Sequence, residues 1–512
     1  MKPLLDYYHR RPLRFALLAG LFFRLLAAFF SEGFITSDDH FQVVEVAQGW
    51  IEGKYLDVWF VSDLEDRQTG RSAFYPGLHW VLFVSLDAIG FTTPIGKMIL
   101  VRLFHAGYSL LIIYFGFRMV YQLAGRELAK KTGLVLALLW LLPVLSVRNL
   151  VEVAAIPAML GAAWYSLSAE TRQQPARWYM LSGELLEVSF EFRYQVGLIV
   201  LGFLVGLALL RNWRGLMFTL LGAGIPFLLL HGVLEIYTGG APFAKIYTYV
   251  MYNLKHATTY FNQPAWTYIL FICGILIPPV GVFLFAGSFW AARKHWPTFL
   301  GVLLFFGFHS FFPNKQERFM FTMVPFFVIL GLIGWAEIEA RFPFWKNKAA
   351  GFVRGSWKFF WGLNLFVLAI VSWQSSKTML VDAMTYMDTR TDVRAIVVED
   401  MNRSRGTLIP LFYMREYPGY DRVGKKFPPD SLALKMQNYP DWRLPNYVLF
   451  VQKPGEDLTE RVTNMETVVG PLQYDTTVQS GFIDRLYLKM NPAVAKADNM
   501  VVYHVSEEKT SE

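Results

Sequence analysis

The chain is poor in charge and in cysteine. Only 17% of its 512 residues are charged, whereas about 25% of the residues of an average soluble domain are charged. Cys273 is the single cysteine, so no intramolecular disulfide can form. The sequence also lacks a fixed-period repeat and a low-complexity segment. These absences exclude disordered, collagen-like and disulfide-stapled proteins, and they argue against a single soluble domain.

The apolar residues lie mostly in long continuous runs. Hydrophobic residues make up 54% of the chain and include 45 Phe and 16 Trp. A bilayer core of about 30 Å needs roughly 17 to 25 apolar residues in each helix. The eleven expected spans are 14–30, 97–122, 132–147, 150–168, 178–192, 194–210, 215–236, 266–290, 297–313, 319–339 and 358–374. The sequence therefore predicts an all-α polytopic membrane protein.

The basic residues predict the orientation of the chain. Lys2 and three arginines precede the first span and no convincing cleavage site follows it, so the N-terminus is expected to be an uncleaved cytoplasmic anchor. Most other bases then fall in cytoplasmic loops, which accounts for the net charge of +8 without a nucleic-acid partner. The stretch 76–95 fits this arrangement only as a re-entrant or interfacial element.

Residues 377–512 follow the last expected span and differ from the rest. Short strand-like runs at 395–398, 447–452 and 500–505 alternate with turns rich in Pro and Asp. We therefore expect a small soluble α/β domain on the extracytoplasmic side. Residues 1–376 would form the transmembrane domain, including a first outer loop over 31–75.

Acidic and basic residues collect in the loops expected on the outer face. Charged groups beside apolar segments are costly and usually mark a site or a pathway. Asp38 and Asp39 are adjacent carboxylates after the first span, and a carboxylate can serve as a base. The other members are His40, Gln42, Glu45, Arg71, Tyr75, Arg148, Glu152, Arg193, Lys315, Glu317 and Arg318. Their convergence predicts a base beside a cationic cluster that binds the phosphate of a lipid headgroup.

Each member also has a purely structural interpretation. Asp38 and Asp39 can cap a helix that begins near His40, and a single base near the end of a span is more often a snorkelling residue. Glu152 and Arg193 can pair with each other inside the bundle. The isolated histidines at 79, 105 and 309 lack the spacing of metal ligands, so we expect no metal there.

Three glutamates interrupt one apolar segment. Glu184, Glu187 and Glu191 recur at steps of three and four, which places them on one face of a helix. A proton or cation path is one interpretation. A helix that faces an aqueous vestibule is the other, and we favour it.

Four segments resemble motifs of the mannosyltransferases of lipid-linked oligosaccharide and GPI-anchor assembly, members of the GT-C superfamily. Residues 37–45 (SDDHFQVVE) are similar to that family's Asp-Glu-aromatic-Gln motif in the first lumenal loop. Residues 70–76, 148–152 and 315–319 (GRSAFYP, RNLVE and KQERF) resemble its Arg-Ser-x-x-x-Pro, Arg-x-x-x-Glu and Lys-Glu-x-Arg-Phe segments. Arg193 falls where the family shows Arg-Pro-Thr. The resemblance covers residues 15 to about 340 in the same order.

The resemblance implies a chemical reaction. It implies inverting transfer of a sugar, mannose by the family's activity, from a polyprenyl- or dolichyl-phosphate carrier to a glycan or glycolipid acceptor. Asp38 would be the base and Asp39 would orient the acceptor, while Arg71, Lys315 and Arg318, with Arg193, would hold the phosphate. The remaining motif residues would contact substrate. No cofactor is required, although a divalent metal is possible.

The expected location is a membrane, as a multi-pass protein in contact with lipids. Short loops favour the bacterial inner membrane over the endoplasmic reticulum. The rival function is a multispan transporter or lipid flippase, with the glutamates at 184, 187 and 191 as an ion path.

Overall fold

The computed structural model describes residues 2–53, 70–237, 240–259, 262–490 and 497–506. Within it the chain divides into two compact units. The first, the helical unit, comprises Met1–Phe29, Lys54–Leu78 and Val101–Trp373. The second, the sheet unit, comprises Phe30–Gly53, His79–Leu100 and Gln374–Glu512. The boundary at 376/377 that the sequence suggests stays a prediction, and residues 54–69 of the expected outer loop lie outside the described residues.

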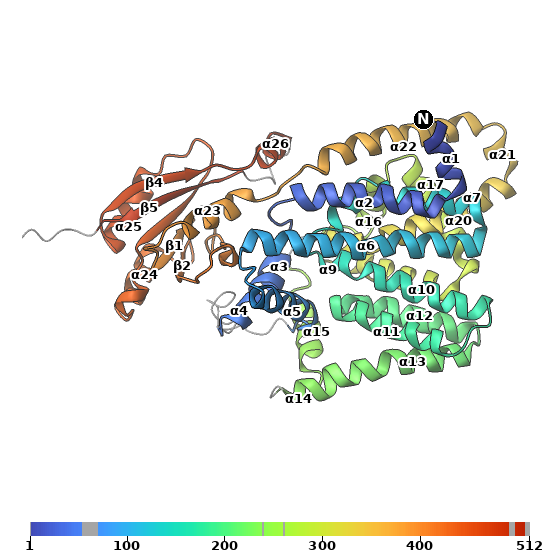
Figure 1. The fold of residues 1–512 in the computed structure, drawn as a ribbon, viewed down its shortest axis with the longest axis horizontal. Coiled ribbons are helices and arrows are strands. Elements are labelled where there is room, and N and C mark those ends of the chain that lie inside the picture. Colours follow the sequence, from blue (N-terminus) through green and yellow to red (C-terminus); the bar gives the residue numbers. More distant parts are fainter. Residues whose placement is uncertain (1, 54–69, 238–239, 260–261, 491–496, 507–512) are drawn as a thin grey trace, which may run out of the picture. The chain divides into compact units, whose positions relative to one another are not determined.

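The helices follow the apolar runs of the sequence (Figure 1). Those up to residue 171 are α1 (Lys2–Arg10), α2 (Pro12–Phe30), α3 (Ser37–Asp39), η1 (His40–Val44), α4 (Glu45–Ile51), α5 (Phe74–Ala88), α6 (Pro94–Ala124), α7 (Arg126–Leu138), α8 (Leu141–Leu145), α9 (Val151–Ala154) and α10 (Ile156–Thr171). Those from 177 to 255 are α11 (Arg177–Phe192), η3 (Tyr194–Val196), α12 (Gly197–Leu209), α13 (Trp213–Phe227), η4 (Leu228–Leu234), α14 (Glu235–Tyr237) and α15 (Ala244–Lys255). The next are α16 (Thr267–Ile275), α17 (Val280–Trp290), η5 (Ala291–Lys294), α18 (Trp296–Phe311), α19 (Arg318–Phe321), α20 (Val324–Arg341), α21 (Pro343–Lys346) and α22 (Ala350–Val371).

The helical membrane architecture is confirmed, but the number of eleven spans is not. Among the described residues, four helices are long and apolar enough to cross a membrane: Pro12–Phe30, Pro94–Ala124, Val151–Thr171 and Trp213–Tyr237. A fifth candidate is the pair Thr267–Ile275 and Val280–Lys294, which is bent by 116°. Other apolar runs form shorter helices, such as Tyr194–Leu209 and Trp296–Phe311. Several expected runs are broken into shorter helices, whereas α20 and α22, with 18 and 22 residues, are long enough but are not among the candidate spans.

The break inside the run 132–147 shows how a bundle accommodates such an interruption. Helix α7 ends at Leu138 and α8 begins at Leu141. The buried side chain of Asn364 on α22 accepts a hydrogen bond from the Trp140 amide at 2.9 Å and donates one to the Leu138 carbonyl at 2.7 Å. Backbone groups freed from a helix are costly inside a membrane unless they find partners. One asparagine therefore satisfies both sides of this break.

Glycines set the close packing of α11 against α13. A Cβ atom at Gly183 would lie 2.1 Å from the Thr219 carbonyl oxygen, and one at Gly222 would lie 2.0 Å from the Met180 carbonyl oxygen. Helices in membranes associate through small residues that let their backbones approach. The two glycines thus form a seam, here called the α11–α13 seam, that any larger side chain would open.

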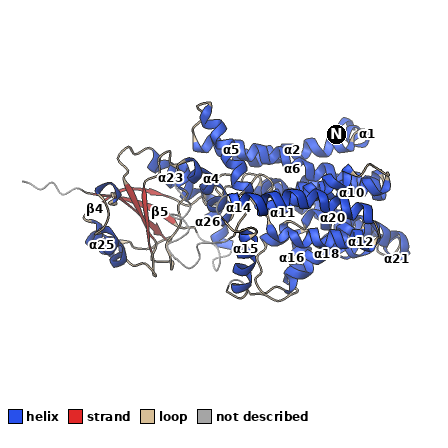
Figure 2. Cartoon of the chain, turned by 90° about the horizontal axis from the view of Figure 1, so that it is seen from below, coloured by secondary structure: helices blue, strands red, loops and turns tan. Residues whose placement is uncertain are grey.

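The sheet unit carries a five-stranded sheet in the order β2-β1-β3-β5-β4 (red in Figure 2). Its strands are β1 (Ala395–Glu399), β2 (Gly419–Val423), β3 (Tyr447–Gln452), β4 (Leu472–Val478) and β5 (Asn499–Val505). β1 pairs in parallel with β2 and β3, whereas β5 pairs antiparallel with β3 and β4. Helices α23 (Thr378–Asp388), α24 (Pro429–Met436), α25 (Thr459–Val469) and α26 (Phe482–Met490) complete the α/β unit. The three strands expected from the sequence are confirmed as β1, β3 and β5.

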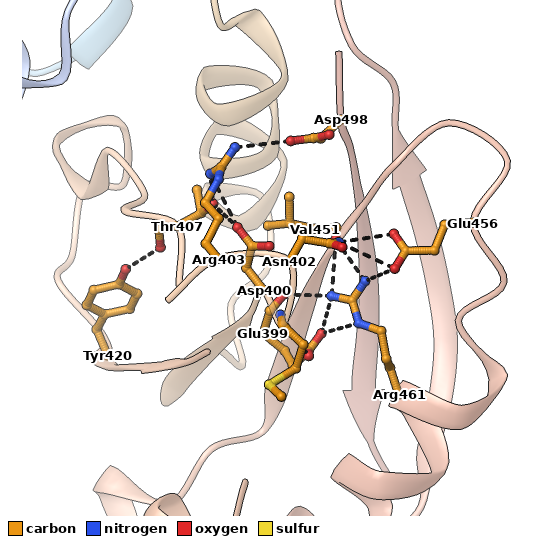
Figure 3. A network of polar contacts seen from close by, with 11 residues as sticks. Glu399, Asp400, Asn402, Arg403, Thr407, Tyr420, Val451, Glu456, Arg461 and Asp498 are labelled. Carbon is orange, nitrogen blue, oxygen red and sulfur yellow. Dashed lines mark hydrogen bonds and ion pairs between the residues drawn. The ribbon is translucent and has the colours of Figure 1, made fainter. Parts of the chain in front are cut away.

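A polar network closes the carboxyl end of β1 (Figure 3). Arg461 donates hydrogen bonds to Glu399 at 2.9 Å, to Glu456 at 2.8 Å and to the Val451 carbonyl at 3.1 Å. Burial raises the pKa of Glu399 despite this arginine. The carboxyl ends of parallel strands are where open α/β sheets commonly bind ligands. Here Arg461 binds the Glu399 carboxylate and the Val451 carbonyl, so the network links β1, β3 and α25.

Candidate functional site

The adjacent carboxylates lie in the first turn of a short helix of the sheet unit. The N-cap of α3 is Thr36, whose hydroxyl oxygen accepts a hydrogen bond from the Asp39 amide at 3.4 Å. The interpretation of Asp38 and Asp39 as the cap is therefore wrong. Asp39 is buried and also contacts the Thr36 hydroxyl, while Asp38 is half-buried. Of the two, Asp38 is the more accessible to a substrate hydroxyl, which suits the expected base.

A lysine that the sequence did not single out accompanies these carboxylates in the same unit. Lys377 precedes α23, and its Nζ lies 3.5 Å from the Ser37 hydroxyl and 4.7 Å from the centroid of the Phe34 ring. Burial lowers the pKa of Lys377 to about 8, although the charges of Asp39 and Asp38 favour its protonated form. The lysine is thus a cation that titrates near neutral pH beside the expected base.

His40 and Glu45 connect the carboxylate segment to the rest of the sheet unit. His40 begins the π-helical turn η1 and Glu45 follows it, and His40 Nε2 lies 3.1 Å from Glu45 Oε1. Glu45 also accepts hydrogen bonds from the Phe412 amide at 2.9 Å and the Tyr417 hydroxyl at 2.8 Å. The His40 ring stacks on Tyr413, with centroids 5.7 Å apart. These contacts favour a structural role for both residues, and their predicted contact with substrate stays a prediction.

Gln42 lies between these residues and is half-buried. Its Oε1 atom is buried and has no hydrogen-bond partner among the residues that the structure describes. Its predicted contact with substrate is not tested by this geometry.

Two arginines of the helical unit lie close to the Glu152 carboxylate and the Phe319 ring. Arg193 forms a buried ion pair with Glu152, and Arg318 Nε lies 3.8 Å from the same carboxylate. The Arg193 and Arg318 guanidinium carbons lie 4.8 and 5.8 Å from the centroid of the Phe319 ring. The structural alternative for Glu152 and Arg193 is confirmed as a contact. The cluster nonetheless brings two guanidinium groups to one carboxylate, and guanidinium groups are the common ligands of phosphate and carboxylate anions.

The turn between α18 and α19 adds a third basic side chain, that of Lys315. Lys315 is buried, donates a hydrogen bond to the Phe312 carbonyl, and lies with Nζ 5.6 Å from the centroid of the Tyr268 ring. Burial lowers the pKa of this lysine. The next residue, Gln316, accepts a hydrogen bond from Arg318 Nε at 2.8 Å and thereby links this turn to the arginine cluster. Arg148 is also buried, whereas Glu317 is exposed.

The segment 70–75 of the helical unit carries two further expected residues. Arg71 is exposed, and Tyr75 is buried with its hydroxyl 2.6 Å from His105 Nε2. His105 Nδ1 lies 2.8 Å from the Val101 carbonyl oxygen, so both ring nitrogens of this histidine have a hydrogen-bond partner. Ser72 donates a hydrogen bond to Glu191 on α11. This bond fixes the start of the segment to the helix that carries the three glutamates.

The candidate residues therefore fall into two groups. Asp38, Asp39, His40, Gln42 and Glu45 belong to the sheet unit. The helical unit holds the others, namely Arg71, Tyr75, Arg148, Glu152, Arg193, Lys315, Glu317 and Arg318. Each group is described by itself, and the catalytic and binding roles stay predictions.

Comparisons with known proteins relate both groups to an established family. The sequence profile of the Alg9-like mannosyltransferase family matches residues 15–407. The comparison with curated proteins gave no match.

Similar solved structures share the fold. ArnT from Cupriavidus metallidurans bound to undecaprenyl phosphate aligns with a TM-score of 0.57 and 14% identity, over 96% of this chain and 98% of that chain. The apo state of that protein gives a TM-score of 0.55 and 12% identity, over 95% of this chain and 96% of that chain. The Archaeoglobus fulgidus oligosaccharyltransferase in complex with Zn and sulfate gives a TM-score of 0.50 and 10% identity, over 86% of this chain and 68% of that chain.

Proposed function

The chain belongs to the Alg9-like mannosyltransferase family and is a membrane glycosyltransferase, and from this premise we propose that it transfers mannose from a polyprenyl- or dolichyl-phosphate carrier to a glycan or glycolipid acceptor. The observation that carries the proposal is the pair of guanidinium groups, those of Arg193 and Arg318, beside Glu152. The family's activity supports mannose as the sugar. The undecaprenyl phosphate bound to ArnT supports a lipid phosphate as the carrier.

The cationic cluster suits the leaving group of this reaction. When the bond between the sugar C1 and the phosphate oxygen breaks, the electron pair of that bond stays on the phosphate. Guanidinium groups bind phosphate oxygens with short charge-assisted hydrogen bonds. Lys315, Arg318 and Arg193, with Arg71 from the segment 70–75, are the proposed ligands of the phosphate. Because these side chains supply the positive charge, the reaction requires no metal, although a divalent ion is compatible with it.

Asp38 is the proposed base. It would accept the proton of the acceptor hydroxyl while the hydroxyl oxygen attacks C1 of the sugar. A single displacement of this kind inverts the anomeric configuration. Asp39, which is held by Thr36, would orient Asp38 and the acceptor. The residues of the remaining motifs, including Tyr75 and Arg148, would line the path of the substrates.

The cellular arrangement is part of the same proposal. The N-terminus would be cytoplasmic and residues 377–512 extracytoplasmic, in a bacterial inner membrane. The transporter or flippase interpretation gains no support from the family match.

Transfer of radiolabelled mannose from polyprenyl-phosphate mannose, measured with pure protein in detergent, tests the proposal. We expect activity without a membrane gradient, and we expect Asp38→Asn to reduce turnover at least 100-fold, because a general base typically contributes about 10²- to 10⁴-fold. Asp430→Asn is the matched control, since Asp430 lies in the first turn of another short helix of the sheet unit and is exposed. Wild-type turnover in Asp38→Asn would remove that residue from the role of base. A protein that moves lipid only across a gradient would restore the transport interpretation.

A further inference from the structure

Two glutamates and a histidine from different helices meet inside the helical unit. Glu187 and Glu191 lie one turn apart on α11, and His231 lies in η4, which continues α13. One side-chain ligand atom from each residue lies within 4.8 Å of the other two. All three side chains are buried, with exposed fractions of 6%, 3% and 3%. Buried ionisable groups at membrane depth are a functional site by default.

The fold brings these residues together for a clear reason. A separation of four residues places Glu187 and Glu191 on the same face of α11. The α11–α13 seam at Gly183 and Gly222 holds the two helices close, so His231 on the continuation of α13 reaches that face. Glu184 does not belong to the cluster, because its side chain is exposed. Of the three glutamates expected on one face of the helix, Glu187 and Glu191 are buried in this cluster, where the sequence favoured an aqueous vestibule.

The carboxylate of Glu187 points to a missing ligand. Its Oε1 atom is buried and has no hydrogen-bond partner among the residues that the structure describes. A buried polar atom without a partner costs about 1 to 3 kcal/mol, and more when it is charged. The side chain is nevertheless 94% buried, given its exposed fraction of 6%, and it faces Glu191 and His231. A cation bound between the three residues would satisfy this oxygen.

The surroundings of His231 match those of a metal-bound histidine. Its Nδ1 atom lies 3.0 Å from Glu235 Oε1, and its Nε2 atom lies 2.5 Å from Glu191 Oε1. A histidine that binds a metal usually donates its other ring N–H to a carboxylate, which fixes the ring and its tautomer. Glu235 fills that position. Glu191 is oriented in turn by the hydroxyl of Ser72.

We propose that Glu187, Glu191 and His231 bind one divalent transition-metal ion of the zinc class. Two carboxylates and a neutral imidazole carry a charge of −2, which a divalent ion neutralises. Zinc accepts one nitrogen and two oxygen ligands at about 2.0 to 2.2 Å in a tetrahedral site, which sets the ligand atoms about 3.4 Å apart. The three atoms lie within 4.8 Å of one another, so rotations of side chains bring them to that spacing. Water would take the fourth position.

The bound ion would act as a clamp between helices. It would tie α11 to η4 and, through the Ser72–Glu191 hydrogen bond, to the segment 70–75. Gly70 at the start of that segment is already packed against α15, since a Cβ atom there would lie 2.1 Å from the Lys245 carbonyl oxygen. The ion would therefore hold the loop that carries Arg71. This site does not depend on the proposed function.

Metal content and thermal unfolding of the full chain in detergent test the proposal. The protein is stripped with a chelator, loaded with Zn²⁺, passed through a desalting column and analysed for zinc by mass spectrometry. We expect about one tightly bound zinc per chain, with a higher unfolding temperature than the stripped protein, because a ligand that binds only the folded state stabilises it. Co²⁺ in place of zinc should give the visible absorption of a tetrahedral site.

Variants identify the ligands. Glu187→Gln, Glu191→Gln and His231→Gln should each abolish stoichiometric zinc, and Glu235→Gln should weaken binding about 10- to 100-fold, the usual effect of losing such a partner. Glu184→Gln is the matched control, because it changes an exposed carboxylate on the same helix, and it should retain zinc. Failure of the loaded wild-type protein to hold zinc or gain stability would overturn the proposal and leave a shared proton as the occupant. Equal zinc loss in Glu184→Gln would overturn it as well. If a ligand variant does not fold, the wild-type titration still decides.

Discussion

Removal of the Arg193 side-chain charge gives a sharp test of the cationic cluster. In Arg193→Met, the carboxylate of Glu152 loses its buried partner. The side chains of Arg193 and Glu152 are exposed by only 5% and 2%, so little water would compensate. Breaking a buried ion pair by removing one partner typically costs about 3 to 5 kcal/mol. Arg318 Nε stays 3.8 Å from Glu152 and keeps a positive charge near this carboxylate. The expected loss of unfolding free energy therefore lies near the lower end of that range, at about 3 kcal/mol.

The second variant separates structure from function. Arg193→Met combined with Glu152→Leu removes both charges, and replacing a buried pair by apolar residues is often neutral or stabilising. We therefore expect the double variant to regain most of the lost free energy of unfolding, measured by SDS titration in mixed micelles. If Arg193 also holds the donor phosphate, mannose transfer stays low although stability returns. Recovery of transfer together with stability would restrict Arg193 to a structural role. Unchanged stability in Arg193→Met would refute the reasoning about the buried pair.

Three further outcomes follow from the sheet unit and the α11–α13 seam. Burial lowers the pKa of Lys377 from 10.5 to about 8, so between these values the unfolded chain binds more protons than the folded chain, and the stability of the wild type rises with pH. Lys377→Met should therefore be more stable than the wild type at pH 7. Denaturant titrations should show this advantage shrinking by pH 10. Glu45→Ala leaves the Tyr417 hydroxyl and the Phe412 amide without their acceptor, at a cost of about 1 to 3 kcal/mol for each buried group, whereas Asp430→Ala should change the unfolding free energy little. Gly222→Leu would collide with the Met180 carbonyl, so α11 and α13 must separate; a thermal melt should show lower stability, while Gly224→Ala, where the added methyl meets open space, should not.

The helices and three strands could be predicted because apolar composition determines them directly. β1 and β3 are buried along most of their length, and their sequences are nearly continuous apolar runs. β2 and β4 were missed because they are the two edge strands, and their sequences, GYDRV and LQYDTTV, are mixed. An edge strand needs no continuous apolar run and often carries charge. The sequence pattern therefore indicated the centre of the sheet and not its margins.

The sequence indicated candidate site residues where they stand close together or belong to recognisable motifs. Asp38 and Asp39 are adjacent, and both the arginine pair with Glu152 and the Lys315 turn follow recognisable motifs. Lys377 is 340 positions from Ser37, and His231 is 40 positions from Glu191. No periodicity connects residues across such distances, because tertiary packing alone brings them together. The Thr36 cap was missed for a local reason, since Ser37, Asp38 and Asp39 are equally good caps by residue type.

The pairing of the first loop with the beginning of the C-terminal segment sets an order for biogenesis. The Phe34 amide donates a hydrogen bond to the Ser376 carbonyl, and the Ser376 amide donates one to the Glu32 carbonyl. Glu45 reaches further, to Phe412 and Tyr417. During synthesis the acidic loop is therefore complete hundreds of residues before its partners leave the ribosome. The acidic segment acquires these contacts only when most of the chain has been translated, so a truncated product would carry the motif without its partners in the C-terminal segment.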